Sequence, residues 1–210
     1  MSNIETKKEK NGILSKIGGD KLILIGAIIV VFALFTALNK NFLTWTNMIN
    51  LMVAASLVGL VAVGHTYLII AGQNDLSPGS LAAFCGTLAA LLLSKDMPMI
   101  VAIIVVLLAG VLVGLFNAWM VNKIKLEAFI ATLVTQNIIR GFAYIICDGK
   151  PVSISNKAYL TIGKARFLTI PVSVWLMILA FVIFGFVLAK TKFGRSVYAI
   201  GGSQEAARLA

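Results

Sequence analysis

The sequence predicts an all-α fold, a polytopic integral membrane bundle with about six apolar segments. Of its 210 residues, 60% are hydrophobic and 12% are charged, whereas soluble domains have about 45–50% apolar and about 25% charged residues. The mean hydropathy is +0.98. A domain of this length in water needs a polar shell, which so few charges cannot supply. We therefore expect most of the surface to face lipid, where helices satisfy their own backbone polar groups.

Six apolar segments carry this prediction. A bilayer core of about 30 Å needs about 20 apolar residues per helix. The segments cover residues 22–38, 48–71, 81–93, 99–121, 126–147 and 167–189. The third, 81–93, is short for a span and follows a run of helix-breaking residues, which predicts a discontinuous or re-entrant helix. An even number of spans places both ends of the chain on one side.

The basic residues indicate which side that is. The chain has 18 Lys and Arg against 8 Asp and Glu, a net charge of +10. With a cytoplasmic N-terminus, most of the cations fall inside, as the positive-inside rule requires. The exceptions on the outer side are Lys40, Lys95, Lys150, Lys157, Lys164 and Arg166. Because the cations lie between apolar runs, we expect them to meet anionic membrane lipid rather than nucleic acid.

This pattern divides the chain into three parts. Residues 1–20 form a polar cytoplasmic leader, residues 21–190 a transmembrane domain, and residues 191–210 a cytoplasmic segment. The loop 148–166 is expected on the extracytoplasmic surface because it is rich in Gly, Pro, Ser and Asn. Within the fourth segment, Gly110 and Gly114 have the spacing of a helix-contact face.

The break before the short segment is the first candidate site. It contains Asn74, Asp75 and Ser77. Broken helices at membrane depth often frame transport sites, because free backbone groups there can bind ligand. The alternative is a plain helix start, with Ser77 as N-cap, Pro78 at the first helical position and Asp75 near the helix N-terminus.

The fifth apolar segment carries the second candidate site. Thr132, Gln136 and Arg140 recur every fourth residue and share a helical face, with Asn137 beside them. An arginine within a span costs at least about 2.5–3.5 kcal/mol, so this face is expected to line a hydrophilic pathway. The alternative is that Arg140 extends towards the headgroups at the outer end of its helix.

Enzyme chemistry finds little support. The sequence contains no Gly-x-x-x-x-Gly-Lys-Ser/Thr phosphate loop, and no catalytic, cofactor or metal site is expected. His65 stands alone in an apolar run, which is typical of an interhelical hydrogen bond. Two alternatives to transport stay open: an intramembrane enzyme that uses His65 with Asp75, and a structural or assembly protein of the membrane.

The C-terminal tail is the third candidate site. Gly201 and Gly202 are expected to end one element, and Ser203 to cap the next. Glu205 then lies in the first turn, where its charge suits the helix dipole. Ala206 and Ala207 are small enough for close docking to another protein, and the alternative is an ordinary surface helix.

Three stretches in order resemble the permease subunits of bacterial ATP-binding-cassette sugar importers of the ribose, arabinose and xylose group. They are Asp75-Leu76-Ser77-Pro78-Gly79-Ser80, Phe129-Ile130-Ala131-Thr132-Leu133 with Ile139-Arg140-Gly141, and Phe193-Gly194-Arg195 through Leu209. The stretch from Arg140 to Lys150 is most similar to L-arabinose permeases. The chain departs from the family pattern at Pro78, where valine is usual.

The resemblance implies import of a monosaccharide, a pentose such as L-arabinose, across the bacterial inner membrane. It implies a second permease copy, a periplasmic or lipid-anchored sugar-binding protein, and a separate cytoplasmic subunit that binds ATP. The residues that would form the coupling helix for the ATPase are Gly201, Gly202, Glu205, Ala206, Ala207 and Arg208. Since members of this group continue for several more spans, we expect the sequence to be truncated at its C-terminus.

Overall fold

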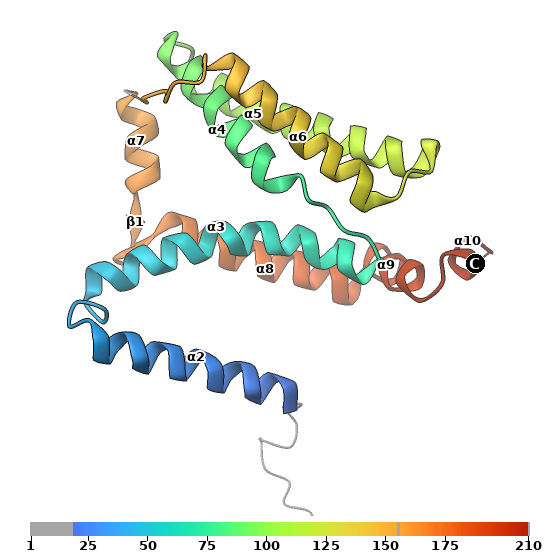
Figure 1. Cartoon of the computed structure of the whole chain (residues 1–210), viewed down its shortest axis with the longest axis horizontal. Helices are drawn as coiled ribbons and strands as arrows, with labels where there is room; N and C mark the ends of the chain where they lie inside the picture. The colour runs from blue at the N-terminus through green and yellow to red at the C-terminus, as the bar shows by residue number, and fades with distance from the viewer. Residues whose placement is uncertain (1–18, 155, 210) are drawn as a thin grey trace, which may run out of the picture. The chain divides into compact units, whose positions relative to one another are not determined.

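The computed structural model describes residues 19–154 and 156–209, most of which are helical (Figure 1). Two compact units can be separated, Met1–Leu51 and Met52–Ala210. Apart from residues 19 and 20, the predicted polar leader lies outside the described residues. The long helices in chain order are α2 (Gly19–Leu38), α3 (Trp45–Ile70), α4 (Pro78–Ser94), α5 (Met99–Trp119), α6 (Ala128–Ile146) and α8 (Val172–Lys190).

These six helices correspond to the six predicted apolar segments. In the described part of the chain, five are long and apolar enough to cross a membrane, and α4 is a shorter apolar helix of 17 residues. The all-α membrane bundle and the short third segment are therefore confirmed. Non-helical residues lie between Gly72 and Ser77, where the sequence predicts the helix break.

In the first unit, aromatic contacts fix the turn after α2. The Phe42 ring packs on Phe32 and Phe35 of α2, with ring centroids 5.4 and 5.5 Å apart. The side-chain amide of Asn47 donates a hydrogen bond to the Phe42 carbonyl at 2.7 Å. These contacts pack the turn against α2 and bond it to the first turn of α3.

In the second unit, α4 packs against both α5 and α6. The contacting faces are built from small residues, which let helix backbones approach closely in a membrane. On α4 the buried residues are Ser80, Ala89, Ala90 and Leu93, and on α6 they are Ala128, Ala131, Thr132, Thr135, Ile139 and Ala143. This three-helix core holds the break segment in place.

The second half of α3 contacts α8 and the helix α9 (Lys192–Gly202). The Tyr67 ring lies 6.3 Å from the ring of Phe184 and 5.9 Å from that of Phe193, and its hydroxyl donates to the Phe184 carbonyl. Further along, Gly201 of α9 approaches the Ile70 carbonyl so closely that a Cβ would overlap it. The last helix that the structure describes is α10 (Gln204–Leu209).

The sixth segment begins later than residue 167, which corrects the sequence prediction. Strands β1 (Arg166–Phe167) and β2 (Ile170–Pro171) pair antiparallel before α8 starts. Leu168 and Thr169 between them have φ values of 50° and 67°. The Trp175 indole donates to the Phe167 carbonyl at 3.1 Å, so this hairpin is bonded to the first turn of α8.

The long loop 148–166 contains a helix that the sequence does not predict. Helix α7 (Lys157–Lys164) starts at Asn156, whose side chain accepts a hydrogen bond from the Tyr159 amide at 3.0 Å. None of its residues is buried. The exposure of α7 agrees with the predicted surface position of this loop, but Asn156 begins a short helix there.

The turn after α5 is also unexpected. Residues Met120–Ile124 form the π-helical segment η1, and Lys125 follows with φ of 65°. Such wide turns are frequent at functional sites. Here the wide turn ends α5 and presents Asn122 beside the break segment, where both line a cavity.

Candidate functional site

The break segment begins with a sharply defined helix end. The Gly72 amide donates to the Ile69 carbonyl at 3.0 Å, and the Gln73 amide donates to the Leu68 carbonyl at 2.8 Å. Gly72 has φ of +73°. This pair of bonds is the Schellman motif, whose left-handed residue favours glycine. Helix α3 is therefore ended by a specific signal, and a non-helical segment follows it.

Asp75 and Ser77 fold the end of the break segment back on itself. Asp75 Oδ1 accepts hydrogen bonds from the Ser77 amide at 2.8 Å and from the Ser77 hydroxyl at 2.7 Å. Ser77 is the N-cap of α4 and Pro78 follows at its start, as predicted. However, the Ser77 side chain does not cap the helix. Its hydroxyl is instead directed to Asp75 and to α5.

Two hydrogen bonds connect this segment to the helices that surround it. The side-chain amide of Asn117, on α5, donates to Ser77 Oγ at 3.1 Å. The backbone amide of Leu76 donates to Thr132 Oγ1 at 3.1 Å, and that hydroxyl donates to the Ala128 carbonyl at 2.7 Å. We call Asp75, Ser77, Asn117 and Thr132 the break network. Through it, the break segment is bonded to both α5 and α6.

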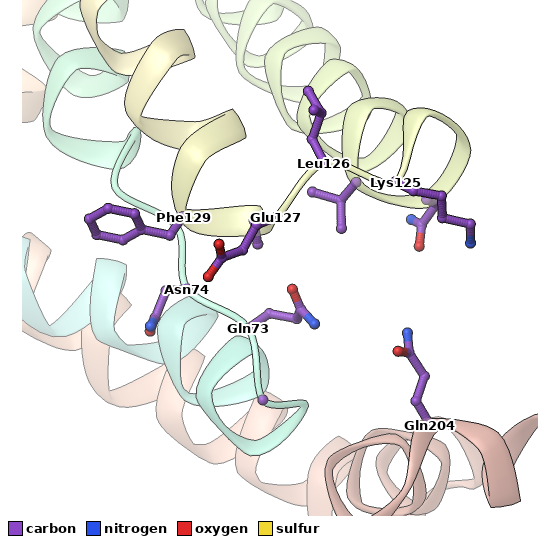
Figure 2. Close-up of a pocket in the computed structure, with 11 residues that line it drawn as sticks. Gln73, Asn74, Lys125, Leu126, Glu127, Phe129 and Gln204 are labelled. Carbon is purple, nitrogen blue, oxygen red and sulfur yellow. The ribbon is translucent and has the colours of Figure 1, made fainter.

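Two neighbouring cavities open beside the break network. One has a volume of about 310 Å³ and is lined by Asp75, Asn117 and Thr132 of the network. The other, of about 380 Å³, is lined by the break segment, the turn before α6 and Gln204. Figure 2 shows Gln73 and Gln204 reaching towards this second space from different segments. Both cavities share Gln73, Asn74 and Gln204, so they adjoin.

The polar residues of the second predicted site do not join the break network. Thr132 is 3% exposed, but Gln136 is only half-buried and Asn137 and Arg140 are exposed. A step of four residues turns a helix about 40° past a full turn, so a three-residue series drifts off the buried face. Arg140 lines a small cavity of about 130 Å³ with Thr87 and Tyr144.

The glycine pair on α5 also differs from expectation. A Cβ built on Gly110 or on Gly114 meets no atom within 4 Å. These glycines therefore make no close helix contact with the described part of the chain, and Gly114 instead lines the 310 Å³ cavity.

His65 and Asp75 do not form the arrangement that an enzyme would need. Asp75 is bonded to Ser77, and His65 is half-buried without a side-chain hydrogen bond among residues 19–154 and 156–209. Within the same residues no group of three or more His, Cys, Asp or Glu is placed to hold a metal ion. His65 and Asp75 therefore do not form a shared catalytic site in the described part of the chain.

The C-terminal tail forms two short helices, α9 and α10, and the second is the short helix that the sequence predicts after Ser203. Helix α9 ends at Gly202, and Ser203 Oγ accepts a hydrogen bond from the Ala206 amide at 3.2 Å. Glu205 lies in the first turn of α10. Glu205, Ala206 and Arg208 are exposed and Ala207 is half-buried. A groove of about 590 Å³ runs beside α10, lined by Lys125, Ile200, Gln204, Glu205, Ala207 and Arg208.

The sequence assigns no functional role to Asn117, although the structure places this residue in the site. It is 6% exposed and lies within an otherwise apolar span. A buried amide in an apolar helix is expensive unless it is bonded, and that isolation was the available signal. Asn122 and Gln204 gave no such signal, because they lie in segments where polar residues are ordinary.

The comparisons with known proteins agree with the sequence resemblance. Residues 47–210 match the family described as branched-chain amino acid transport system, permease component. The chain is 37% identical over 187 residues to the ribose import permease protein of Haemophilus influenzae, covering 87% of this chain and 58% of that protein. It is 39% identical over 189 residues to the L-arabinose transport system permease protein of Escherichia coli, covering 90% and 57%.

A third relative is the ribose import permease protein of Bacillus subtilis, 36% identical over 201 residues, which cover 95% of this chain and 61% of that protein. The chain thus spans less than two thirds of the length of these curated relatives. No solved structure matches it significantly. Because the family match extends over most of the chain, from α3 to its end, the chain belongs to the permease-component family of branched-chain amino acid transport systems.

Proposed function

We propose that this chain is the membrane-spanning subunit of an ATP-binding-cassette importer for a monosaccharide, a pentose such as L-arabinose. The observation that carries the proposal is the identity of 39% with an L-arabinose permease and of 37% with a ribose permease over most of the chain. The five long apolar helices supply the spans that such a subunit needs. On this proposal the chain does no ATP chemistry itself and uses no cofactor of its own.

The proposal places the protein in the bacterial inner membrane with a cytoplasmic N-terminus, as the distribution of Lys and Arg favours. A second permease copy, a periplasmic or lipid-anchored sugar-binding protein and a cytoplasmic ATPase complete the transporter. The break segment, with Asn74, Asp75 and Ser77, lies on the sugar pathway. The proposal assigns three further residues, which the break network does not include, to the outer part of the same pathway: Gln136, Asn137 and Arg140.

The tail would couple the permease to the ATPase. Its exposed small residues and the groove beside α10 suit a docking surface. Gly201, Gly202, Glu205, Ala206, Ala207 and Arg208 form this coupling surface in the proposal. An assembly protein without transport activity would have no need of an ATPase on this face.

Replacing Glu205 with lysine is expected to weaken ATPase binding by about tenfold or more. The change reverses an exposed charge in the first turn of α10, where the helix dipole favours an acidic residue. The measurement is co-purification of the tagged chain with the ATPase subunit of the same transporter, quantified across a series of salt concentrations.

Ser94→Lys is the control, because it adds a cation to an exposed residue at the end of α4, on the opposite predicted side. It should leave the co-purified amount unchanged. ATPase recovery by Glu205→Lys equal to that by the unaltered chain would contradict the coupling role of α10. Failure of the unaltered chain to retain any ATPase would contradict the transporter proposal itself.

A further inference from the structure

We propose that the 310 Å³ cavity beside Asn117 binds a neutral, polyhydroxylated small molecule of monosaccharide size. On the function proposed above, on which this identification rests, that molecule is the transported sugar. The cavity lies where the ends of α3, α5 and α6 meet the break segment and the start of α10. The sequence-derived pathway residues Gln136, Asn137 and Arg140 do not line it.

The first argument is a buried acceptor without a donor. Asn117 is 6% exposed, and its Nδ2 donates to Ser77 Oγ at 3.1 Å. Its Oδ1 has no hydrogen-bond partner among the residues that the structure describes. Leaving a buried amide oxygen unpaired is costly. Because nearly all buried polar groups have a hydrogen-bond partner, an unpaired one points to a partner outside the protein chain. Asn117 also lines the cavity, so rotation of its carboxamide towards a ligand hydroxyl would let the oxygen accept that missing hydrogen bond.

The second argument is the chemistry of the cavity wall. Five carboxamide side chains line it, those of Gln73, Asn74, Asn117, Asn122 and Gln204. A carboxamide both donates and accepts, as a hydroxyl does. Among the described residues no Lys or Arg lines the cavity, and its single charged group, Asp75, already accepts two bonds from Ser77. This lining favours a neutral ligand with several hydroxyls and disfavours an anion.

The third argument is room. The lining also includes residues with small side chains or none, among them Ala71, Gly114 and Ala118. A Cβ on Gly114 meets no atom within 4 Å, so the glycine leaves space that no other side chain of the described chain fills. A volume of about 310 Å³ lies at the lower end of the range for small-molecule sites. Apolar walls with a few convergent polar groups are the usual composition of such sites.

The site also has an exit. Gln73, Asn74 and Gln204 line both this cavity and the adjoining 380 Å³ cavity of Figure 2. That second cavity is bordered by Lys125 and Glu127 in the turn before α6. Since Gln204 is the first residue of α10, a ligand leaving by this route would pass the tail that we assign to ATPase coupling.

The test is equilibrium binding by the full chain in lipid nanodiscs, with radiolabelled L-arabinose and radiolabelled D-ribose as separate probes. We expect saturable binding that unlabelled pentose competes with and that ribose phosphate does not. Gly114→Leu should weaken it by at least about tenfold, because the leucine side chain fills the cavity. Gln204→Leu should weaken it by about threefold or more through loss of a ligand hydrogen bond.

Gly110→Leu is the matched control, one turn earlier on α5, equally open to an added side chain but outside the cavity. It should bind within about twofold of the unaltered chain. The proposal is overturned if the unaltered chain shows no saturable pentose binding. It is also overturned if Gly114→Leu binds pentose as tightly as the unaltered chain, or if both glycine variants lose binding equally.

A parallel uptake assay separates this proposal from the function on which it rests. Suppose that the unaltered chain binds pentose, that Gly114→Leu abolishes this binding, and that the assembled transporter shows no ATP-driven uptake. This result would support the proposed site and contradict the proposed importer function. Normal ATP-driven uptake by Gly114→Leu would support the importer and overturn the site.

Discussion

Thr132→Val is expected to detach the break segment from α6. The substitution keeps the shape of the side chain but removes the oxygen that accepts from the Leu76 amide at 3.1 Å. Leaving that part-buried amide unpaired costs about 1–2 kcal/mol, so its hydrogen exchange should accelerate by about 5–30-fold. The measurement is amide exchange of residues 72–78 by mass spectrometry, in detergent or nanodiscs.

The same helix offers a matched control for this experiment. Thr135 is also 3% exposed, but its Oγ1 has no hydrogen-bond partner among residues 19–154 and 156–209. Thr135→Val therefore removes no bond to the break segment and should leave the exchange of residues 72–78 unchanged. Equal protection of Leu76 in both variants would show that the break network does not hold the segment.

Gly201→Ala is expected to displace the tail from α3, with loss of about 1–3 kcal/mol of stability. The added Cβ would overlap the Ile70 carbonyl, which is backbone and cannot rotate away as a side chain can. Helix α9 must therefore move, together with α10 and the Gln204 side chain that lines both cavities. We expect a lower thermal midpoint and reduced ATPase co-purification.

Gly202→Ala provides the comparison at the next residue. A Cβ there meets no atom within 4 Å, so its effect on stability should stay within about 0.5 kcal/mol. A difference between these adjacent variants isolates the close approach from the general effect of removing a glycine. If Gly202→Ala lowers the midpoint as much as Gly201→Ala does, the contact with Ile70 is not what positions the tail.

The helical bundle could be predicted from the sequence because each long apolar helix is specified by its own composition. Apolar runs of sufficient length predict the spans, and the Gly72 to Pro78 region predicts the break by its helix-breaking residues. Ser203 and Glu205 correctly indicate the start of α10. These signals are local, and the backbone responds to them locally.

The contacts that the sequence does not predict depend on long-range packing. Thr132 and Arg140 share a face by spacing, yet Thr132 is buried and bonded to the break segment, whereas Arg140 is exposed. The role of Asn117 depends on Ser77, which lies 40 residues earlier in the chain. The wide turn of η1 and the short helix α7 also carry no simple local pattern, so neither could be read from the sequence.

The most direct test of the account is sugar uptake into proteoliposomes that contain the intact permease with the ATPase and sugar-binding subunits of the same transporter. We predict that labelled L-arabinose or D-ribose accumulates when ATP is supplied on the ATPase side. Without ATP, or with an ATPase that cannot hydrolyse it, accumulation should fall to the level of empty liposomes. Uptake that is independent of ATP, or no pentose uptake by the complete assembly, would contradict the account.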